Sequence, residues 1–253
     1  MKALLMDIGN SRLKWGVLEH DDIRRTGHIS MDRVRSSGLS ALTSKLPRDV
    51  DEVIASNVAG ASFATRISGV VGAHCGRDVH FVHTERTACG VTNSYRQPRR
   101  MGVDRWVAMI GAWSEVGREC LVVDTGTAVT IDALDETGQH LGGQILPGVT
   151  LMADALAAGT SDIPATRRKA SETSKGLAMF ASNTAGAVSQ GACNAVVGAV
   201  DRAVAAMRAE RLEPEVFLTG GDASRILKLL EAEPIHRPHL VLQGLAKLLE
   251  HRR

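Results

Sequence analysis

Short apolar runs, each ended by a turn signal, predict an α/β protein. In the first part of the chain, such runs end at Met6 and then cover residues 12–19, 23–29 and 50–56. Comparable runs end at Val123 and cover 129–134, 140–146 and 215–219. Between the two sets, apolar residues from Trp106 to Trp113 recur at helical spacing, which predicts an amphipathic helix. Strands that alternate with helices predict mixed sheets flanked by helices.

The two sets of strands belong to an internal repeat. Asp7-Ile8-Gly9-Asn10-Ser11 matches Asp124-Thr125-Gly126-Thr127-Ala128 at an offset of 117 residues, close to half of the 253-residue chain. Each motif ends an apolar run and is followed by a strand, a turn and another strand. A unit used twice indicates duplicated halves. The boundary between them is expected near residues 117–119.

Composition narrows the class of protein. The chain is 44% apolar and 23% charged with a net charge of +2, an ordinary balance for a soluble globular protein. The small net charge and 3% aromatic content weigh against nucleic-acid partners. No apolar stretch reaches the length of a membrane span, so no membrane partner is expected. Four scattered cysteines suit free thiols in a reducing compartment, which predicts a cytoplasmic protein.

The Asp-x-Gly motifs are candidate phosphate sites. The chain has neither a P-loop nor a Gly-x-Gly-x-x-Gly fingerprint. In the first motif, a strand delivers Asp7 to its carboxyl end, and Gly9 allows a tight turn whose N–H groups can face an anion. Asp7 would then lie near Mg²⁺, with Lys14 supplying positive charge. One such motif alone is more often a plain hairpin turn. Two copies with matched flanking strands favour the phosphate site.

Two further segments carry candidate chemistry. Gly102-Val103-Asp104-Arg105 opens the predicted helix, where Asp104 is either a general base for a substrate hydroxyl or a carboxylate that merely stabilises the first turn. Arg105 would hold an anionic group. Gly220-Gly221 follows a strand and either admits a nucleotide or forms an ordinary turn.

Two other segments carry weaker signals. His80 and His83 point to opposite faces of their strand, so no metal site is expected there. The polar stretch 160–175 is expected to form a solvated loop or lid.

Together these motifs resemble the type III pantothenate kinases, a family of the acetate and sugar kinase, Hsp70 and actin superfamily. The resemblance covers nearly the whole chain. It rests on the motifs at 7–11, 102–105 and 124–132, on the Gly-rich segment 142–148 and on Asn183-Thr184. It implies two duplicated ribonuclease-H-like halves of the actin-like ATPase type, residues 1–118 and 119–253, with the active site in the cleft between them.

The resemblance also implies a reaction and the residues that perform it. The reaction is ATP-dependent phosphorylation of pantothenate to 4′-phosphopantothenate, the first step toward coenzyme A. The catalytic base would be Asp104. ATP and its phosphates would be bound by Asp7, Ile8, Gly9, Asn10, Ser11, Arg12, Leu13, Lys14, Thr127, Gly220 and Gly221. Pantothenate would be bound by Tyr95, Gly102, Val103, Asp104, Arg105 and Thr184. Mg²⁺ would arrive with ATP at Asp7, and Asp124 would ligate a monovalent cation, K⁺ or NH₄⁺. A homodimer is implied as well.

Three alternatives stay open at this level, one of them an actin-like filament former, which would need a self-complementary head-to-tail surface. Another small-molecule kinase of the superfamily would use the same duplicated motifs on a different acceptor. Members of this family have also carried the label Bvg accessory factor, which implies a non-catalytic role beside a transcriptional regulator. The acidic residues Asp7, Asp104 and Asp124 favour the enzyme, because a scaffold has no chemical need for all three.

Overall fold

The computed structural model describes residues 1–163 and 179–252, which form two compact units. Unit 1 consists of residues 1–118, 136–141 and 239–253, and unit 2 of residues 119–135 and 142–238. Unit 2 therefore differs from the expected second half, 119–253, by the segments 136–141 and 239–253. Most of the expected solvated loop, residues 164–178, lies outside the described residues.

Each unit is built on a five-stranded mixed sheet flanked by helices. In unit 1 the strands are β1 (Lys2–Ile8), β2 (Arg12–Glu19), β3 (Asp22–Ser30), β4 (Glu52–Asn57) and β5 (Val79–Phe81), with a separate pair β6 (Thr87–Ala88) and β7 (Val91–Thr92). Its helices are α1 (Met31–Ser37), α2 (Ser40–Thr43), α3 (Ala61–Cys75), α4 (Val103–Val116) and α8 (Leu240–His251), with a 3₁₀ turn at Pro98–Arg100.

Unit 2 repeats this plan. Its strands are β8 (Cys120–Thr125), β9 (Ala128–Leu134), β10 (His140–Pro147), β11 (Glu215–Thr219) and β12 (Ile235–His236), and its helices are α5 (Val149–Gly159), α6 (Thr184–Ala209) and α7 (Ala223–Ile226). The first two residues of β10, His140 and Leu141, belong to unit 1. The strand orders are β3-β2-β1-β4-β5 and β10-β9-β8-β11-β12. In both units the first strand pairs antiparallel with the second and parallel with the fourth. The α/β fold with duplicated mixed sheets is therefore confirmed.

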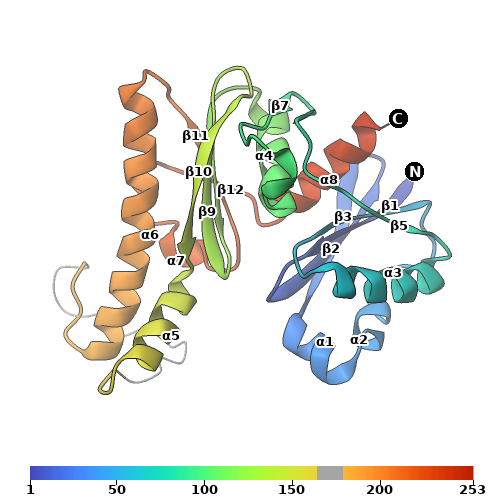
Figure 1. Ribbon diagram of the computed structural model, residues 1–253, viewed down its shortest axis with the longest axis horizontal. Coiled ribbons are helices and arrows are strands. Elements are labelled where there is room, and N and C mark those ends of the chain that lie inside the picture. The colour runs from blue at the N-terminus through green and yellow to red at the C-terminus, as the bar shows by residue number, and fades with distance from the viewer. Residues whose placement is uncertain (164–178, 253) are drawn as a thin grey trace. The chain divides into compact units, whose positions relative to one another are not determined.

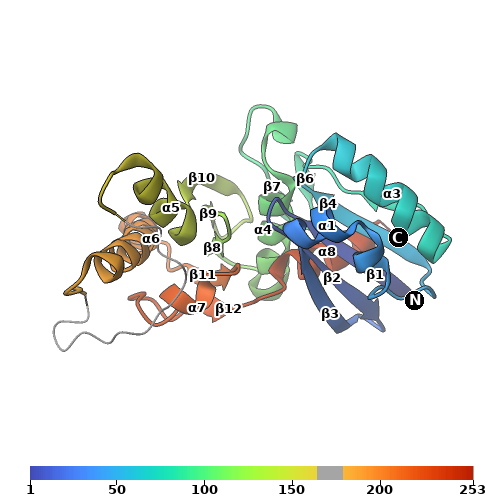
Figure 2. The ribbon, with the colours of Figure 1, turned by 90° about the horizontal axis from the view of Figure 1, so that it is seen from below.

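Helices cover both faces of the unit 1 sheet, which explains why β1 is buried on both sides. Alternate β1 residues Leu4, Met6 and Ile8 pack with apolar side chains of α1, α2 and α3. The opposite face carries Leu5 and Asp7 and is covered by α4 and α8 (Figure 1). In unit 2 the apolar stripe of α6 packs on β8, β9 and β11, and α5 lies beside α6 (Figure 2).

Two glycines let α4 and α8 cross closely. A Cβ at Gly111 would lie 2.6 Å from the carbonyl oxygen of Leu240, and one at Gly244 would collide with the carbonyl oxygen of Val107. This packing places the C-terminal helix in unit 1, although the expected division at residue 118 assigns it to the second half. Amphipathic pattern alone does not specify which sheet a helix covers.

The close crossing makes Gly244→Ala a severe change. The added methyl group has no room, so the helices must separate, and we expect a loss of about 3 kcal/mol in the free energy of unfolding, measured by urea denaturation. Gly198→Ala is the matched control, because a Cβ at that helical position of α6 meets nothing within 4 Å. It should stabilise the protein by roughly 0.5–1 kcal/mol. Equal effects of the two changes would contradict the packing argument.

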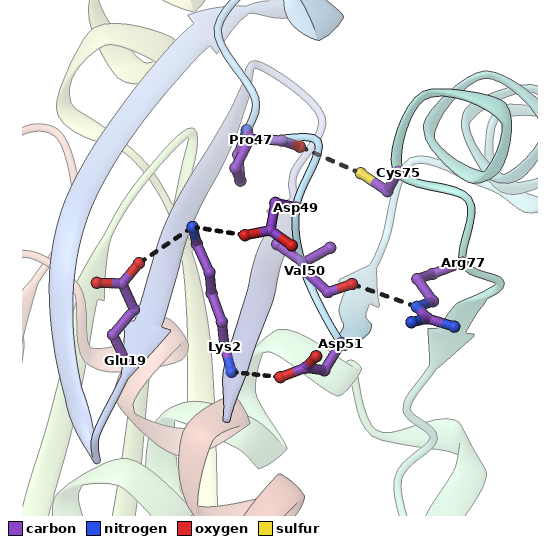
Figure 3. A network of polar contacts seen from close by, with 8 residues as sticks. All are labelled: Lys2, Glu19, Pro47, Asp49, Val50, Asp51, Cys75 and Arg77. Carbon is purple, nitrogen blue, oxygen red and sulfur yellow. Dashed lines mark hydrogen bonds and ion pairs between the residues drawn. The ribbon is translucent and has the colours of Figure 1, made fainter.

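Polar contacts fasten the strands of unit 1 at the end of the sheet opposite Asp7 (Figure 3). The Lys2 amide donates to Asp51 Oδ2 at 2.8 Å, and the Lys2 ammonium lies 3.4 Å from Glu19 Oε1. Arg77 Nε donates to the carbonyl oxygen of Val50 at 3.2 Å. These structural contacts tie together the amino ends of β1, β4 and β5 and the carboxyl end of β2. The candidate chemistry lies at the carboxyl end of β1.

Candidate active site

The carboxyl end of β1 brings three polar side chains together on one face of the sheet. Asp7 is paired in register with Lys14 of β2 and with Ser56 of β4. Ser56 is buried, and its Oγ donates to Asp7 Oδ1 at 3.0 Å. Burial raises the pKa of Asp7 above its usual range, while Lys14 and the Ser56 hydrogen bond act in the opposite direction. Asp7 is thus a carboxylate held close to one ammonium group and one hydroxyl group.

The turn after β1 is the first Asp-x-Gly turn of the chain. The Gly9 amide donates to the carbonyl oxygen of Arg12 at 3.0 Å, which closes the turn, and Asn10 and Ser11 are exposed beside it. Ile8 and Leu13 are instead buried in the core, with no side-chain surface exposed. Both residues belong to the expected phosphate-binding segment, but they can offer only backbone atoms to a ligand.

Asp104 lies in the first turn of α4, as the sequence predicted. Its Oδ1 accepts a hydrogen bond from the Arg105 amide at 2.9 Å. A Cβ at Gly102 would lie 2.6 Å from that same oxygen, so glycine leaves the carboxylate its space. The negative charge of Asp104 further raises the pKa of Asp7, although less than burial does. The two carboxylates therefore belong to one electrostatic group within unit 1.

The buried Arg105 pairs with the half-buried Tyr95 next to Asp104. Arg105 is 6% exposed, and its Nη1 donates to the Tyr95 hydroxyl at 3.0 Å. The guanidinium carbon lies 5.8 Å from the centre of the Tyr95 ring, within cation–π range. Asn93 Oδ1 accepts a hydrogen bond from the Tyr95 amide at 2.9 Å and fixes the backbone there. An arginine buried in this way is suited to hold an anionic group.

Two residues of this region were missed by the sequence analysis. Ser56 ends a predicted strand, and its position at the carboxyl end of a strand beside β1 was the available signal. His140 is 1% exposed and stacks on Tyr95 with ring centroids 6.2 Å apart. No local pattern in the sequence points to this contact, because His140 follows Tyr95 by 45 positions.

Unit 2 holds the second Asp-x-Gly turn at the carboxyl end of β8. The Thr125 hydroxyl donates to the carbonyl oxygen of Thr219 at 2.8 Å, which ties this turn to the end of β11. Gly220 has φ +101°, and a Cβ there would lie 2.6 Å from Asp124 Oδ1. The Gly148 amide donates to the carbonyl oxygen of Thr127 at 2.9 Å. Asp124, Thr127 and Gly220 are therefore neighbours, and Gly221 follows directly.

Thr184 lies outside that turn, as the exposed first residue of α6. The preceding residue, Asn183, caps the helix by accepting a hydrogen bond from the Gly186 amide at 2.8 Å. Thr184 therefore has a defined position at a helix N-terminus.

Cysteines and clusters of metal-ligating side chains are other groups that can carry chemistry in a protein. All four cysteines are free thiols, and burial raises the pKa of Cys120 to about 12, which keeps it protonated. Within residues 1–163 and 179–252 no three His, Cys, Asp or Glu side chains come together as a metal-binding group. None of the helices in this part of the chain has the length and apolar character needed to cross a membrane.

Comparison with known proteins identifies the family. The family model of type III pantothenate kinase matches residues 3–206. A type III pantothenate kinase of Azoarcus sp. (strain BH72) is 37% identical over 243 residues, covering 96% of this chain and 89% of the relative. The chain belongs to the type III pantothenate kinase family. A second member, from Alkalilimnicola ehrlichii, is 34% identical and covers 97% of this chain and 96% of its own.

Solved structures agree with this family at the level of the fold. A Campylobacter jejuni protein with the name of a Baf family transcriptional activator has a TM-score of 0.61 at 18% identity, with 98% of each chain covered. The ethanolamine utilization protein EutJ from Carboxydothermus hydrogenoformans has a TM-score of 0.55 at 13% identity, with 98% of this chain and 90% of that one covered. At these identities the likeness shows the fold alone.

A hollow elsewhere in unit 1 does not coincide with the family's motifs. It has a volume of about 430 Å³ and is lined by the β2–β3 turn, α4 and α8, including Ile23, Gly111, His239 and Gln243. None of the predicted site residues lines it. We therefore place the candidate active site of this type III pantothenate kinase family member at Asp7, Asp104 and Arg105.

Proposed function

We propose that the protein transfers the γ-phosphoryl group of ATP to the primary hydroxyl of pantothenate, which gives 4′-phosphopantothenate and ADP. One observation carries the proposal beyond family membership. Within unit 1, Asp104 lies in electrostatic reach of Asp7 and directly precedes the buried Arg105. A base, a site for metal-bound phosphates and an anion-binding group are the parts that phosphoryl transfer to an anionic acceptor requires.

In this mechanism the acceptor is held by α4 and the loop before it. Arg105 and Tyr95 bind the pantothenate carboxylate, and Asp104 accepts the proton of the attacking hydroxyl. General base catalysis of this kind contributes about 10²–10⁴-fold to a rate. Gly102 leaves room around the base, and Val103 adds apolar contact to the acceptor. In unit 2, the family resemblance assigns Thr184 to pantothenate as well.

The two Asp-x-Gly turns are assigned to ATP separately. In unit 1 the 9–11 turn and Lys14 would bind phosphate oxygens. In unit 2 the family resemblance assigns Thr127, Gly220 and Gly221 to the nucleotide. Mg²⁺ fits the donor set at Asp7, because this ion is commonly held by one or two carboxylates together with substrate phosphates and water. When bound, the metal neutralises charge on the phosphates. Lys14 orients the chain of phosphates.

A monovalent cation, K⁺ or NH₄⁺, fits Asp124. Its carboxylate supplies an anionic ligand. Asp124 Oδ1 lies against the backbone at Gly126 and Gly220, since Cβ atoms added there would stand 3.5 and 2.6 Å from it. The cation would neutralise charge close to the nucleotide.

We expect Asp124→Ala to abolish stimulation of turnover by KCl, because the change removes the anionic ligand. The measurement is initial rate against KCl concentration at constant ionic strength, with choline chloride as the balancing salt. Glu136→Ala, which removes an exposed carboxylate of the β9–β10 turn, is the control and should keep the potassium response. An unchanged response in Asp124→Ala would overturn the cation assignment.

We also propose a homodimer, in the cytoplasm. Unit 2 exposes large apolar side chains on β10, on α5 and just before α6, including Ile145 at 63% and Phe180 at 65% exposed. Covering such side chains with a second copy of the chain would remove apolar surface from water. The free thiols suit a reducing compartment.

Light scattering after size exclusion tests the oligomer. Ile145→Asp should shift the mass from dimer to monomer, because a charge would then have to be buried in the interface. Leu229→Asp changes another exposed apolar residue of unit 2 and should leave the mass unchanged. A monomeric parent protein would contradict the dimer.

The reaction itself is tested by ADP release with Mg-ATP and KCl, with and without pantothenate, and by mass spectrometry of the product. Pantothenate-dependent ADP together with a phosphopantothenate peak supports the proposal. ADP release that depends on a different acceptor would assign the protein to another small-molecule kinase. Bound ATP without turnover on any acceptor would favour an accessory role.

A further inference from the structure

His140 is a buried polar residue that stands directly behind the acceptor-binding pair. It is the first residue of β10 and is 1% exposed. Its Nδ1 lies 3.0 Å from the Ser94 hydroxyl, and its ring stacks on Tyr95 at an interplanar angle of 28°. Tyr95 in turn accepts the hydrogen bond from Arg105. These contacts form a continuous chain from Ser94 through His140 and Tyr95 to the guanidinium group.

The turn before β10 is fixed in place within unit 1. The Thr92 amide donates to the carbonyl oxygen of Gly138 at 2.9 Å, and Gln139 Nε2 donates to the carbonyl oxygen of Thr92 at 3.3 Å. Gly138 has φ +81°, and a Cβ there would collide with the carbonyl oxygen of Gly90. This close approach sets the position from which His140 reaches Tyr95. The stacking is therefore supported by anchored backbone on both sides.

We propose that His140 is a positioning residue that fixes the Tyr95 ring and, through it, aims Arg105 at the carboxylate of the acceptor. The inference rests on the proposed function, because it assigns the carboxylate of pantothenate to the Tyr95–Arg105 pair. Arg105 forms an ion pair well only when its planar fork meets the carboxylate in the right orientation. His140 restricts the Tyr95 phenol, which in turn holds the guanidinium group of Arg105. It therefore acts on binding of the acceptor carboxylate and not on proton transfer.

This role predicts a selective kinetic change in His140→Ala. Loss of an aromatic pair, worth about 0.5–1.5 kcal/mol, should raise KM for pantothenate by up to about tenfold. The value of kcat should stay within about threefold, and KM for ATP should not change. His140→Phe keeps a ring for stacking and should restore most of the affinity. His74→Ala, at the end of α3, is the control and should leave all three constants unchanged.

Two measurements separate positioning from simple support of the fold. Pantothenol carries a hydroxymethyl group in place of the carboxylate, so its dissociation constant, measured by calorimetry, should be nearly the same for the parent protein and His140→Ala. In a Tyr95→Phe background, which removes the hydroxyl that accepts from Arg105, the further change His140→Ala should have a smaller effect than it has alone. Both results are expected only if His140 acts through its contact with Tyr95 and the hydrogen bond from Arg105 to Tyr95.

Several results would overturn the inference. An unchanged KM for pantothenate in His140→Ala would refute it while leaving the proposed function intact. Equal weakening of pantothenate and pantothenol, or full additivity with Tyr95→Phe, would reduce His140 to a packing residue. If His140→Ala does not fold, His140→Phe is compared with the parent protein instead. A loss of pantothenate affinity in His140→Phe, which retains a ring, would also refute the inference. A parent protein that neither binds nor phosphorylates pantothenate would instead refute the proposed function, and this inference with it.

Discussion

Asp104→Asn should lower kcat by about 10²–10⁴-fold while ATP still binds. Asparagine keeps the shape of the side chain and an oxygen that can accept from the Arg105 amide, so the first turn of α4 stays intact. What it cannot do is accept the proton of the attacking hydroxyl. Single-turnover rates and ATP titration on the same protein samples separate the lost chemistry from lost binding.

The competing explanation for Asp104 is stabilisation of a helix N-terminus, worth about 0.3–1 kcal/mol. Asp32→Asn is the matched control, because Asp32 is the first-turn carboxylate of α1, on the opposite face of the same sheet. Both changes should lower stability slightly, as measured by thermal unfolding. Only Asp104→Asn should slow turnover. Turnover of Asp104→Asn within a few-fold of the parent would exclude the role of base.

Asp7→Asn should make the protein more stable and nearly inactive. The folded pKa of Asp7 is raised, so the folded state holds this proton more tightly than the unfolded state does. The ionised carboxylate of Asp7 therefore lowers the free energy of unfolding. This loss begins as the pH rises above the pKa of an unfolded Asp, and it is complete above the pKa of Asp7 in the folded protein. Asparagine removes the cost and can still accept the hydrogen bond from Ser56. The melting temperature at pH 7 should rise, and the gain should shrink as the pH falls toward the range of an unfolded Asp.

The activity of Asp7→Asn should fall although its stability rises. Without the carboxylate, Mg-ATP loses an anionic ligand, and we expect kcat/KM for ATP to fall by about a hundredfold, the scale on which one preorganised electrostatic group acts. Asp51→Asn is the control, since Asp51 accepts from the Lys2 amide at the other end of β1. That change should leave kcat unchanged and give no stabilisation. Lower stability together with full activity in Asp7→Asn would contradict both parts of the prediction.

The sequence alone predicted the strands and the repeat with good accuracy. The runs 12–19 and 215–219 coincide with β2 and β11, and the helix around Trp106 begins at Gly102-Val103 as expected. These features depend on local periodicity and on turn residues, and both can be recognised within a short stretch of sequence. The matching strand orders of the two sheets follow from the repeat, because similar segments fold into similar units.

The sequence predicted only those residues of the candidate site that belong to its motifs. Register and electrostatics bring the predicted residues Asp7, Lys14 and Asp104 together in unit 1. Ile8 and Leu13 were included with their neighbours, but their side chains belong to the core. The chemical roles of all these residues stay predictions until the variants are measured.

Only the tertiary structure decided which distant segments meet. Helix α8 joins unit 1 because Gly111 and Gly244 allow the backbones of α4 and α8 to touch, which no apolar pattern specifies. His140 reaches Tyr95 because the turn at 138–139 is hydrogen bonded to Thr92. By itself, the sequence determined the elements, the repeat and the motif residues. It left open the partners of buried polar groups, because these depend on long-range packing between segments that carry no shared local signal.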